Sequence, residues 1–109
     1  MQVIPLENPE TVHEAVHIII SALTIQEIAD IKKTSRNDFV LSSHFCLGAD
    51  IRNSLVYQNS NFQLLKKDCL KIFNGEIEPD NNYYGIHEDE ISECILEKLW
   101  EQIRAKVSW

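Results

Sequence analysis

The chain is poor in glycine and proline, with three of each in 109 residues. So few turn-forming residues disfavour a turn-rich β-sandwich and a disordered chain. The longest aliphatic run, Ile18–Ile20, is far shorter than the roughly 20 residues of a membrane-spanning helix. The first ten residues have neither the basic stretch nor the apolar core of a secretory signal. We therefore expect a protein of the cytoplasm that does not enter membranes.

Cysteine is also scarce, and its pattern predicts neither a disulfide framework nor a zinc site. Cys46, Cys69 and Cys94 are odd in number, lack C-x-x-C spacing, and each lies in a helical pattern. Such positions are typical of buried, reduced cysteines in a reducing compartment. His13 and His17 are four residues apart, a spacing that can hold a metal, but no third ligand follows at a diagnostic spacing. We predict no metal and no cofactor.

Basic residues are almost absent from the stretch between Glu76 and Glu101. Between Glu76 and Glu101, nine acidic residues accompany one basic residue, Lys98. The formal charge of the whole chain is −7, so this region accounts for the imbalance. A field of this sign repels nucleic acid and membranes and attracts basic proteins. The alternative is a solvated helix face that only keeps the protein soluble.

Apolar residues recur at helical spacing, and no strand pattern competes with them. The sequence predicts an all-α fold, a single domain over residues 1–109 with about five helices. Asn8 and Pro9 have the pattern of a helix start. Thr24 and Glu27 have the T-x-x-E spacing of a capping box. The expected helices cover about 9–23, 24–33, 38 or 41 to 56, 62–73 and 88–107, with the longest irregular stretch at 76–86.

The central stretch from Leu41 to Ser60 carries an unusual polar row. His44, Gly48 and Arg52 recur at i, i+4 and i+8, so on one continuous helix they share a face. A glycine inside a helix costs about 1 kcal/mol relative to alanine, so we expect another backbone to approach closely there. The apolar surface beside the row is expected from Phe45, Leu47, Ile51 and Leu55.

Arg52 is expected to connect helices rather than to bind a substrate. A buried charge persists only when it is paired, and Asp89 or Glu90 at the start of the last helix are the expected partners. Asn53 is expected to bond a loop carbonyl. The alternative is a small enzyme that uses His44, Arg52 and a carboxylate, which requires a pocket around those groups.

The run from His44 to Asn53, H-F-C-L-G-A-D-I-R-N, resembles the H-F-G-L-G-x-x-I-R-N signature of a small uncharacterised bacterial and phage domain family. Residues 87–92, H-E-D-E-I-S, stand where that family has H-P-D-D-M-S before its final helix. Cys46 replaces a glycine of the signature, and Glu88 replaces the proline. The resemblance implies a structural pattern without an established activity. The pattern is kept at His44, Gly48, Arg52, Asn53 and Asp89.

A small, acidic, all-helical chain without an active-site motif also resembles, in general character, the immunity proteins of contact-dependent growth inhibition. This resemblance implies a non-enzymatic inhibitor that binds a basic toxin domain, commonly a nuclease, and covers its active site. A phage or bacterial accessory domain that binds another protein is the alternative. The expected contact residues lie on the last helix and the loop before it: Asp80, Tyr83, Tyr84, Glu88, Glu90, Glu93, Glu97 and Glu101.

Overall fold

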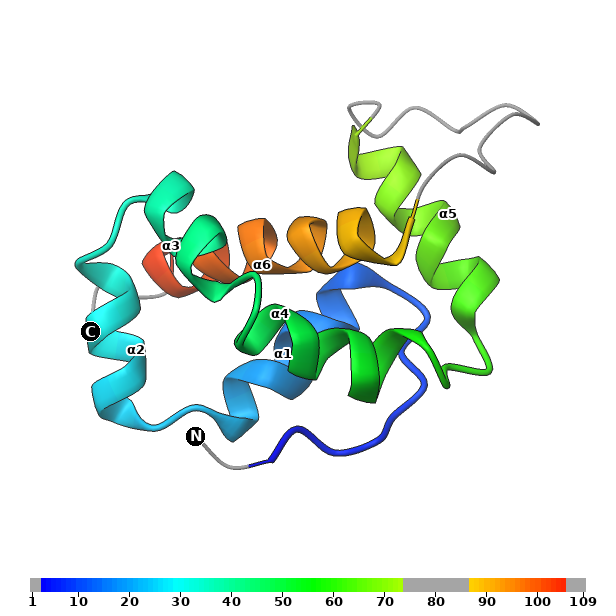
Figure 1. Cartoon of the computed structure of the whole chain (residues 1–109), viewed down its shortest axis with the longest axis horizontal. Helices are drawn as coiled ribbons and strands as arrows, with labels where there is room; N and C mark the ends of the chain where they lie inside the picture. The colour runs from blue at the N-terminus through cyan, green and yellow to red at the C-terminus, as the bar shows by residue number, and fades with distance from the viewer. Residues whose placement is uncertain (1–2, 74–86, 106–109) are drawn as a thin grey trace.

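In the computed structural model, which describes residues 3–73 and 87–105, helix α6 (Glu88–Ala105) crosses the middle of the molecule (Figure 1). The described residues form six α-helices and one π-helix, and no strand occurs among them. The predicted all-α fold is confirmed. The elements before α6 are α1 (Val12–Ala22), α2 (Ile25–Lys32), α3 (Arg36–Ser43), α4 (Leu47–Ile51), the π-helix η1 (Arg52–Val56) and α5 (Phe62–Phe73).

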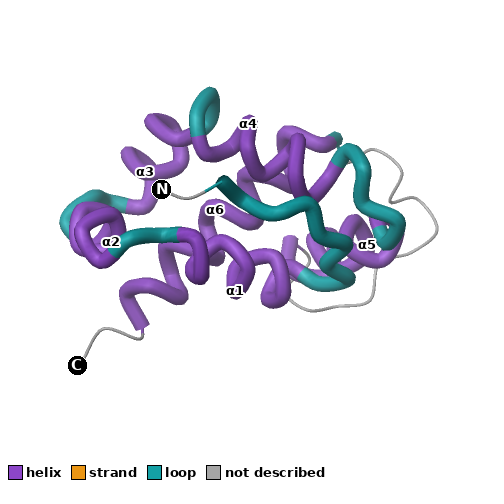
Figure 2. Tube along the Cα trace, turned by 90° about the horizontal axis from the view of Figure 1, so that it is seen from below, coloured by secondary structure: helices purple, strands orange, loops and turns teal. Residues whose placement is uncertain are grey.

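Helix α6 is central because one of its faces is apolar over its whole length. It lies between α1 on one side and α3 and α4 on the other (Figure 2). Burial of each large apolar side chain contributes about 1.5–3 kcal/mol, so this face holds the fold together. The predicted inner stripe is confirmed: Ile91, Ile95, Leu99 and Ile103 are all buried, and Cys94 and Leu96 lie beside them.

The first helix begins at Val12 rather than at Pro9. Its N-cap is Thr11, whose side-chain oxygen accepts a hydrogen bond from the backbone N–H of Glu14 at 3.1 Å. The sequence therefore contains two possible N-caps, Asn8 and Thr11, and the helix begins after the later one. Asn8 and Pro9 instead hold the N-terminal segment against the turn that precedes α5.

Asn59 is the residue that fixes this contact. It is buried, and its side-chain N–H groups donate to the carbonyl oxygens of Pro9 at 2.9 Å and Leu55 at 3.0 Å. Its side-chain oxygen accepts from the backbone N–H of Asn61 at 2.6 Å. Asn8 completes the contact by accepting from the backbone N–H of Ser60 at 2.8 Å. The predicted turn at 58–61 is thus also a tertiary anchor.

Helix α2 has the predicted capping box. Thr24 accepts from the backbone N–H of Glu27 at 3.1 Å, and the Glu27 carboxylate accepts from the backbone N–H of Thr24 at 2.9 Å. This backbone hydrogen bond lowers the pKa of the Glu27 carboxyl. The inner face of α2 is narrow: Ile31 is buried, whereas Ile25 is 88% exposed.

The expected continuous central helix is broken, which corrects the prediction for this stretch. Helix α3 ends at Ser43, residues 44–46 form a turn, and α4 resumes at Leu47. Cys46 has a non-helical backbone conformation, and its N–H donates to the Ser43 carbonyl oxygen at 3.2 Å. The helix then widens into the π turn of η1, where the N–H of Tyr57 bonds the carbonyl of Arg52 at 2.8 Å.

The break changes the surroundings of the next apolar residues. Ile51 and Leu55 are fully buried and Leu47 is half-buried, as expected. Phe45, expected beside them, is 83% exposed.

Three of the contact residues that the sequence predicts, Asp80, Tyr83 and Tyr84, lie outside the described residues. None of the helices in the described ranges is long and apolar enough to cross a membrane.

Candidate functional site

The side chain of Arg52 connects three elements from a buried position. Its Nη1 atom donates to the hydroxyl of Ser92 at 3.0 Å, and its Nη2 atom donates to the backbone carbonyl of His44 at 3.3 Å. Its Nε atom lies 3.5 Å from a carboxylate oxygen of Asp89, so the predicted ion pair is present. Arg52 is 8% exposed. One side chain therefore joins the turn at 44–46 and η1 to the first turns of α6.

Ser92 is a member of this cluster that the sequence analysis missed. It is fully buried in the apolar face of α6, and its hydroxyl donates to the carbonyl of Asp89 at 2.9 Å while it accepts from Arg52. The signal was a serine within an otherwise apolar stripe, three residues after Asp89. Within the described ranges, every buried side-chain nitrogen or oxygen has a hydrogen-bond partner. The cluster is thus arranged as a helix connection.

Gly48 lies where the cluster leaves little room for a side chain. A Cβ atom there would be 3.2 Å from the carbonyl oxygen of Ser43 and 3.3 Å from Nη1 of Arg52. It would also be 3.7 Å from a methyl group of Leu96 on α6. A backbone does approach Gly48 closely, but it is the carbonyl of Ser43 at the end of α3 in the same stretch, and the contact with α6 is made by the Leu96 side chain.

Asn53 and His44 are the two other polar residues expected at this site. Asn53 is exposed on η1, and its expected bond to a loop carbonyl stays a prediction. His44 contributes its backbone carbonyl to Arg52, whereas its half-buried ring contacts the ring of Phe45 edge to face, 4.8 Å between centroids.

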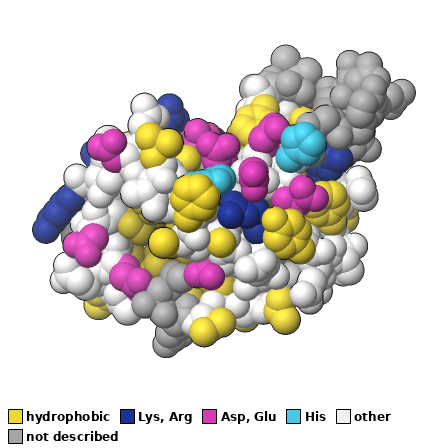
Figure 3. Space-filling model, viewed as in Figure 1, with side chains coloured by type: hydrophobic (Ala, Val, Ile, Leu, Met, Phe, Trp, Pro, Cys, Tyr) yellow, Lys and Arg dark blue, Asp and Glu magenta, His cyan; other side chains and the backbone are white. Residues whose placement is uncertain are grey.

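Acidic side chains gather on the outer face of α6. Glu90, Glu93, Glu97 and Glu101 follow one another at intervals of three, four and four residues, so they share the face opposite the buried stripe. We call these four residues the acidic face. No described helix lies over this edge of α6 between α3 and α5 (Figure 1), and acidic side chains line it in the space-filling view (Figure 3).

The members of the acidic face differ in their surroundings. Glu90 and Glu93 are exposed, while Glu97 and Glu101 are half-exposed. Glu101 pairs with Lys98 at 3.1 Å. Glu88, also predicted as a contact residue, is half-buried in the first turn of α6, where a carboxylate is favoured by the helix dipole. Glu90, Glu93 and Glu97 are thus the carboxylates best placed to meet a partner.

Exposed hydrophobic side chains lie beside the acidic ones (Figure 3). Leu41 is 74% exposed and Phe45 is 83% exposed, four residues further along. The sequence already indicated the exposure of Phe45. Leu47 and Ile51 are four residues apart and share a face, but Phe45 precedes Leu47 by two residues, about 200° around a helix. Phe45 therefore belonged with Leu41 and not with the core.

The three cysteines divide into one exposed and two buried thiols. Cys46 is exposed in the turn, contrary to the expectation that it is buried. Cys69 on α5 and Cys94 on α6 are buried in the core, as expected. A hydrogen bond to Cys94, together with burial, raises the pKa of the Cys69 thiol. Because both cysteines are buried, we expect them to be unreactive in the folded protein.

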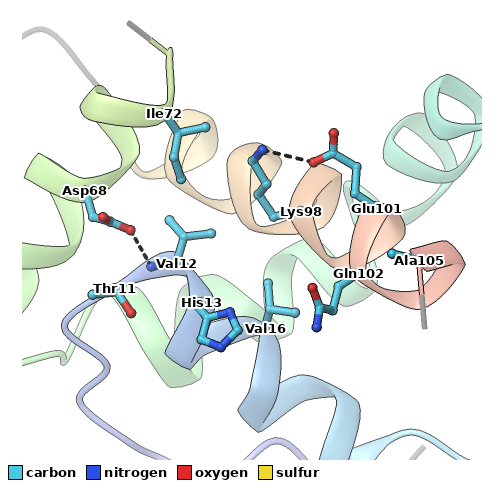
Figure 4. A pocket seen from close by; sticks show the side chains of 10 residues that line it. All are labelled: Thr11, Val12, His13, Val16, Asp68, Ile72, Lys98, Glu101, Gln102 and Ala105. Atoms are coloured by element: carbon cyan, nitrogen blue, oxygen red, sulfur yellow. Dashed lines mark hydrogen bonds and ion pairs between the residues drawn. The ribbon is translucent and has the colours of Figure 1, made fainter. Parts of the chain in front are cut away.

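A cleft of about 490 Å³ lies between α1, α5 and α6 (Figure 4). Three of its charged side chains already have partners. Asp68 accepts from the backbone N–H of Val12 at 2.8 Å, and Lys98 pairs with Glu101 on the other wall. His13 also lines the cleft and is exposed. In the ranges 3–73 and 87–105, no group of three or more His, Cys, Asp or Glu side chains could hold a metal ion.

The comparisons with known proteins identify a family without a known activity. The model of the family described as Domain of unknown function (DUF6794) matches residues 8–103. This match contains all the residues of the Arg52 cluster, from His44 to Ser92. No curated protein and no solved structure matches the chain. The chain belongs to this small uncharacterised family, DUF6794.

Proposed function

We propose that the protein is an immunity protein, a non-enzymatic inhibitor that binds a basic toxin domain in the bacterial cytoplasm and covers its active site. The observation that carries this proposal is the acidic face of α6, where Glu90, Glu93 and Glu97 stand on one outer edge with no described helix over them. Such a face attracts a cationic surface and speeds association with it.

The spacing of these carboxylates suits a cationic groove. Residues three or four apart on a helix are about 4.5–6 Å apart along its axis, so the acidic face forms a line of negative charge. A nuclease toxin carries a line of positive charge where it holds the phosphate backbone of its substrate. An acidic helix laid into that groove would exclude the substrate.

The Arg52 cluster supports this proposal by fixing the start of α6. Asp89 and Ser92 in the first turns of α6 are bonded to Arg52, which is also bonded to the turn at 44–46. A helix held at its N-terminal end and along its apolar face presents its outer face in one orientation. Rigid presentation lowers the entropy that binding would otherwise cost.

Growth of bacteria that express the toxin tests the proposal. The reading frame immediately upstream would be cloned, its C-terminal portion expressed inducibly, and growth followed with and without this protein. We expect growth arrest that the wild-type protein relieves and that Glu93→Lys/Glu97→Lys relieves poorly. The matched control is Glu7→Lys/Glu10→Lys, which changes the net charge equally on exposed residues outside α6.

Arrest that the wild-type protein does not relieve would contradict immunity against that neighbour. An accessory domain that binds another protein would then be the better explanation of the acidic face.

A further inference from the structure

The turn at residues 44–46 holds a large aromatic side chain away from the core. Its backbone is fixed on both sides, because Cys46 N–H donates to Ser43 and the His44 carbonyl accepts from buried Arg52. The Phe45 ring is 83% exposed and touches the His44 ring edge to face. An exposed phenylalanine on a braced turn is a pre-organised contact residue, since little conformational entropy is lost when it is buried by a partner.

We infer that this turn is a second contact element, with Phe45 as an anchor that enters an apolar recess on a basic protein partner. The inference rests on the proposed function, which supplies the identity of that partner. Leu41, 74% exposed and one helical turn earlier, extends the apolar contact. An aromatic anchor beside a charged rim is the usual composition of an interface hot spot.

Charge complementarity indicates that the partner is basic around its recess. Asp89, bonded to the same arginine as the turn, keeps a side-chain exposure of 64%. On the other side of the turn, a groove of about 330 Å³ runs between α2 and α4. Its described lining has an apolar floor, three carboxylates and no basic side chain: Leu23, Ile31 and Leu47, with Glu27, Asp30, Asp50 and Cys46.

A second copy of this chain fits the surface less well. In a two-fold symmetric dimer the same patch faces itself, so the carboxylates around the turn would meet each other. The formal charge of −7 adds to that repulsion. A basic partner turns the same charges into attraction.

The test measures binding of the toxin domain encoded immediately upstream to four proteins: wild type, Phe45→Ala, Leu64→Ala and Glu93→Lys/Glu97→Lys. Leu64 is the matched control, a half-exposed apolar residue on α5. We expect Phe45→Ala to bind about 30-fold more weakly, the size of a hot-spot loss. Its melting temperature should stay unchanged because the ring is exposed. Leu64→Ala should bind like wild type.

The outcomes separate this inference from the proposed function. Wild-type affinity in Phe45→Ala would overturn the inference and leave the acidic face standing. Weakened binding by Phe45→Ala together with wild-type binding by Glu93→Lys/Glu97→Lys would overturn the acidic face as the contact surface and leave the inference standing. No binding by the wild-type protein would overturn both. A dimer in sedimentation that Phe45→Ala dissociates would make the occupant a second copy and overturn the basic partner.

Alkylation of the neighbouring Cys46 gives a second measurement that does not depend on a substitution. Cys46 is the exposed cysteine among the three and lies directly after Phe45. Complex formation with the toxin domain should slow its reaction with a maleimide at least tenfold. An unchanged rate in a saturated complex would overturn the contact.

Discussion

The Nη2 atom of Arg52 lies 3.3 Å from the carbonyl oxygen of His44, the residue that follows the last residue of helix α3. In an unbroken helix this carbonyl would accept from the N–H four residues later. The arginine takes the place of that donor at the break. The same guanidinium bonds Ser92 and Asp89 on α6, so the break and the central helix are stabilised by one side chain.

Replacement of Arg52 by alanine should therefore lower stability strongly. The His44 carbonyl and the Ser92 hydroxyl would lose a charged donor, a loss of about 2–3 kcal/mol. The midpoint of thermal unfolding should fall on the order of 10 °C. The melting temperature of Arg52→Lys should lie between those of the wild type and Arg52→Ala, because an ammonium group cannot reproduce the forked geometry of the guanidinium. An unchanged melting curve for Arg52→Ala would contradict the connecting role.

Gly48→Ala should destabilise the protein although alanine is the better helix former. The propensity gain is about 1 kcal/mol, whereas overpacking against a fixed carbonyl costs about 1–3 kcal/mol. Part of the crowding comes from Nη1 of Arg52 at 3.3 Å. The loss measured by urea unfolding should therefore shrink in an Arg52→Ala background. Equal losses in both backgrounds would show that the arginine does not restrict this position.

Asn59→Ala should weaken the attachment of the N-terminal segment. Asn59 donates to the carbonyls of Pro9 and Leu55 and accepts from Asn61, all from a buried position. Loss of these three hydrogen bonds should lower the free energy of unfolding by about 2 kcal/mol. Ser42→Ala, which removes a hydroxyl that donates to the nearby Phe39 carbonyl, is the control and should cost much less. Equal effects would argue against Asn59 as the anchor.

Thiol labelling should distinguish the three cysteines in the native protein. Cys46 should react with a maleimide at a rate close to that of a free thiol, because it is exposed. Cys69 and Cys94 should react only at the rate of unfolding, because both are buried and the pKa of Cys69 is raised. Mass spectrometry of peptides after timed labelling checks this. Rapid labelling of Cys69 would contradict the packing of α5 on α6.

The sequence predicted the helical fold and its inner stripes because apolar periodicity is a local property that burial preserves. The stripe of α6 and the capping box of α2 are examples. It also predicted that Gly48 permits a close approach and that Arg52 pairs with Asp89 or Glu90, of which Asp89 is the partner. Those predictions depend on the missing side chain of glycine and on the charge of arginine, which are the same in a continuous and in a broken helix.

The features that the sequence did not predict depend on competition between local and tertiary contacts. The break after Ser43 is stabilised by the guanidinium of Arg52, which bonds the carbonyl of His44 eight residues earlier. Helical spacing alone does not predict this contact. Asn8 has the residue type of a helix cap, yet it bonds the backbone of Ser60 instead. In both cases a distant partner replaced the local one, and Phe45 lies on the surface as a result.

The affinity of the upstream toxin domain for charge-reversed variants, measured against salt concentration, tests the central claim most directly. If the acidic face of α6 binds the toxin, reversal at Glu90, Glu93 and Glu97 should weaken binding and flatten its salt dependence, because fewer ion pairs form. Glu7→Lys/Glu10→Lys should keep the wild-type salt dependence. Affinity and salt dependence that are unmoved by reversal on α6 would contradict the claim, and the acidic face would then be only a solvated surface.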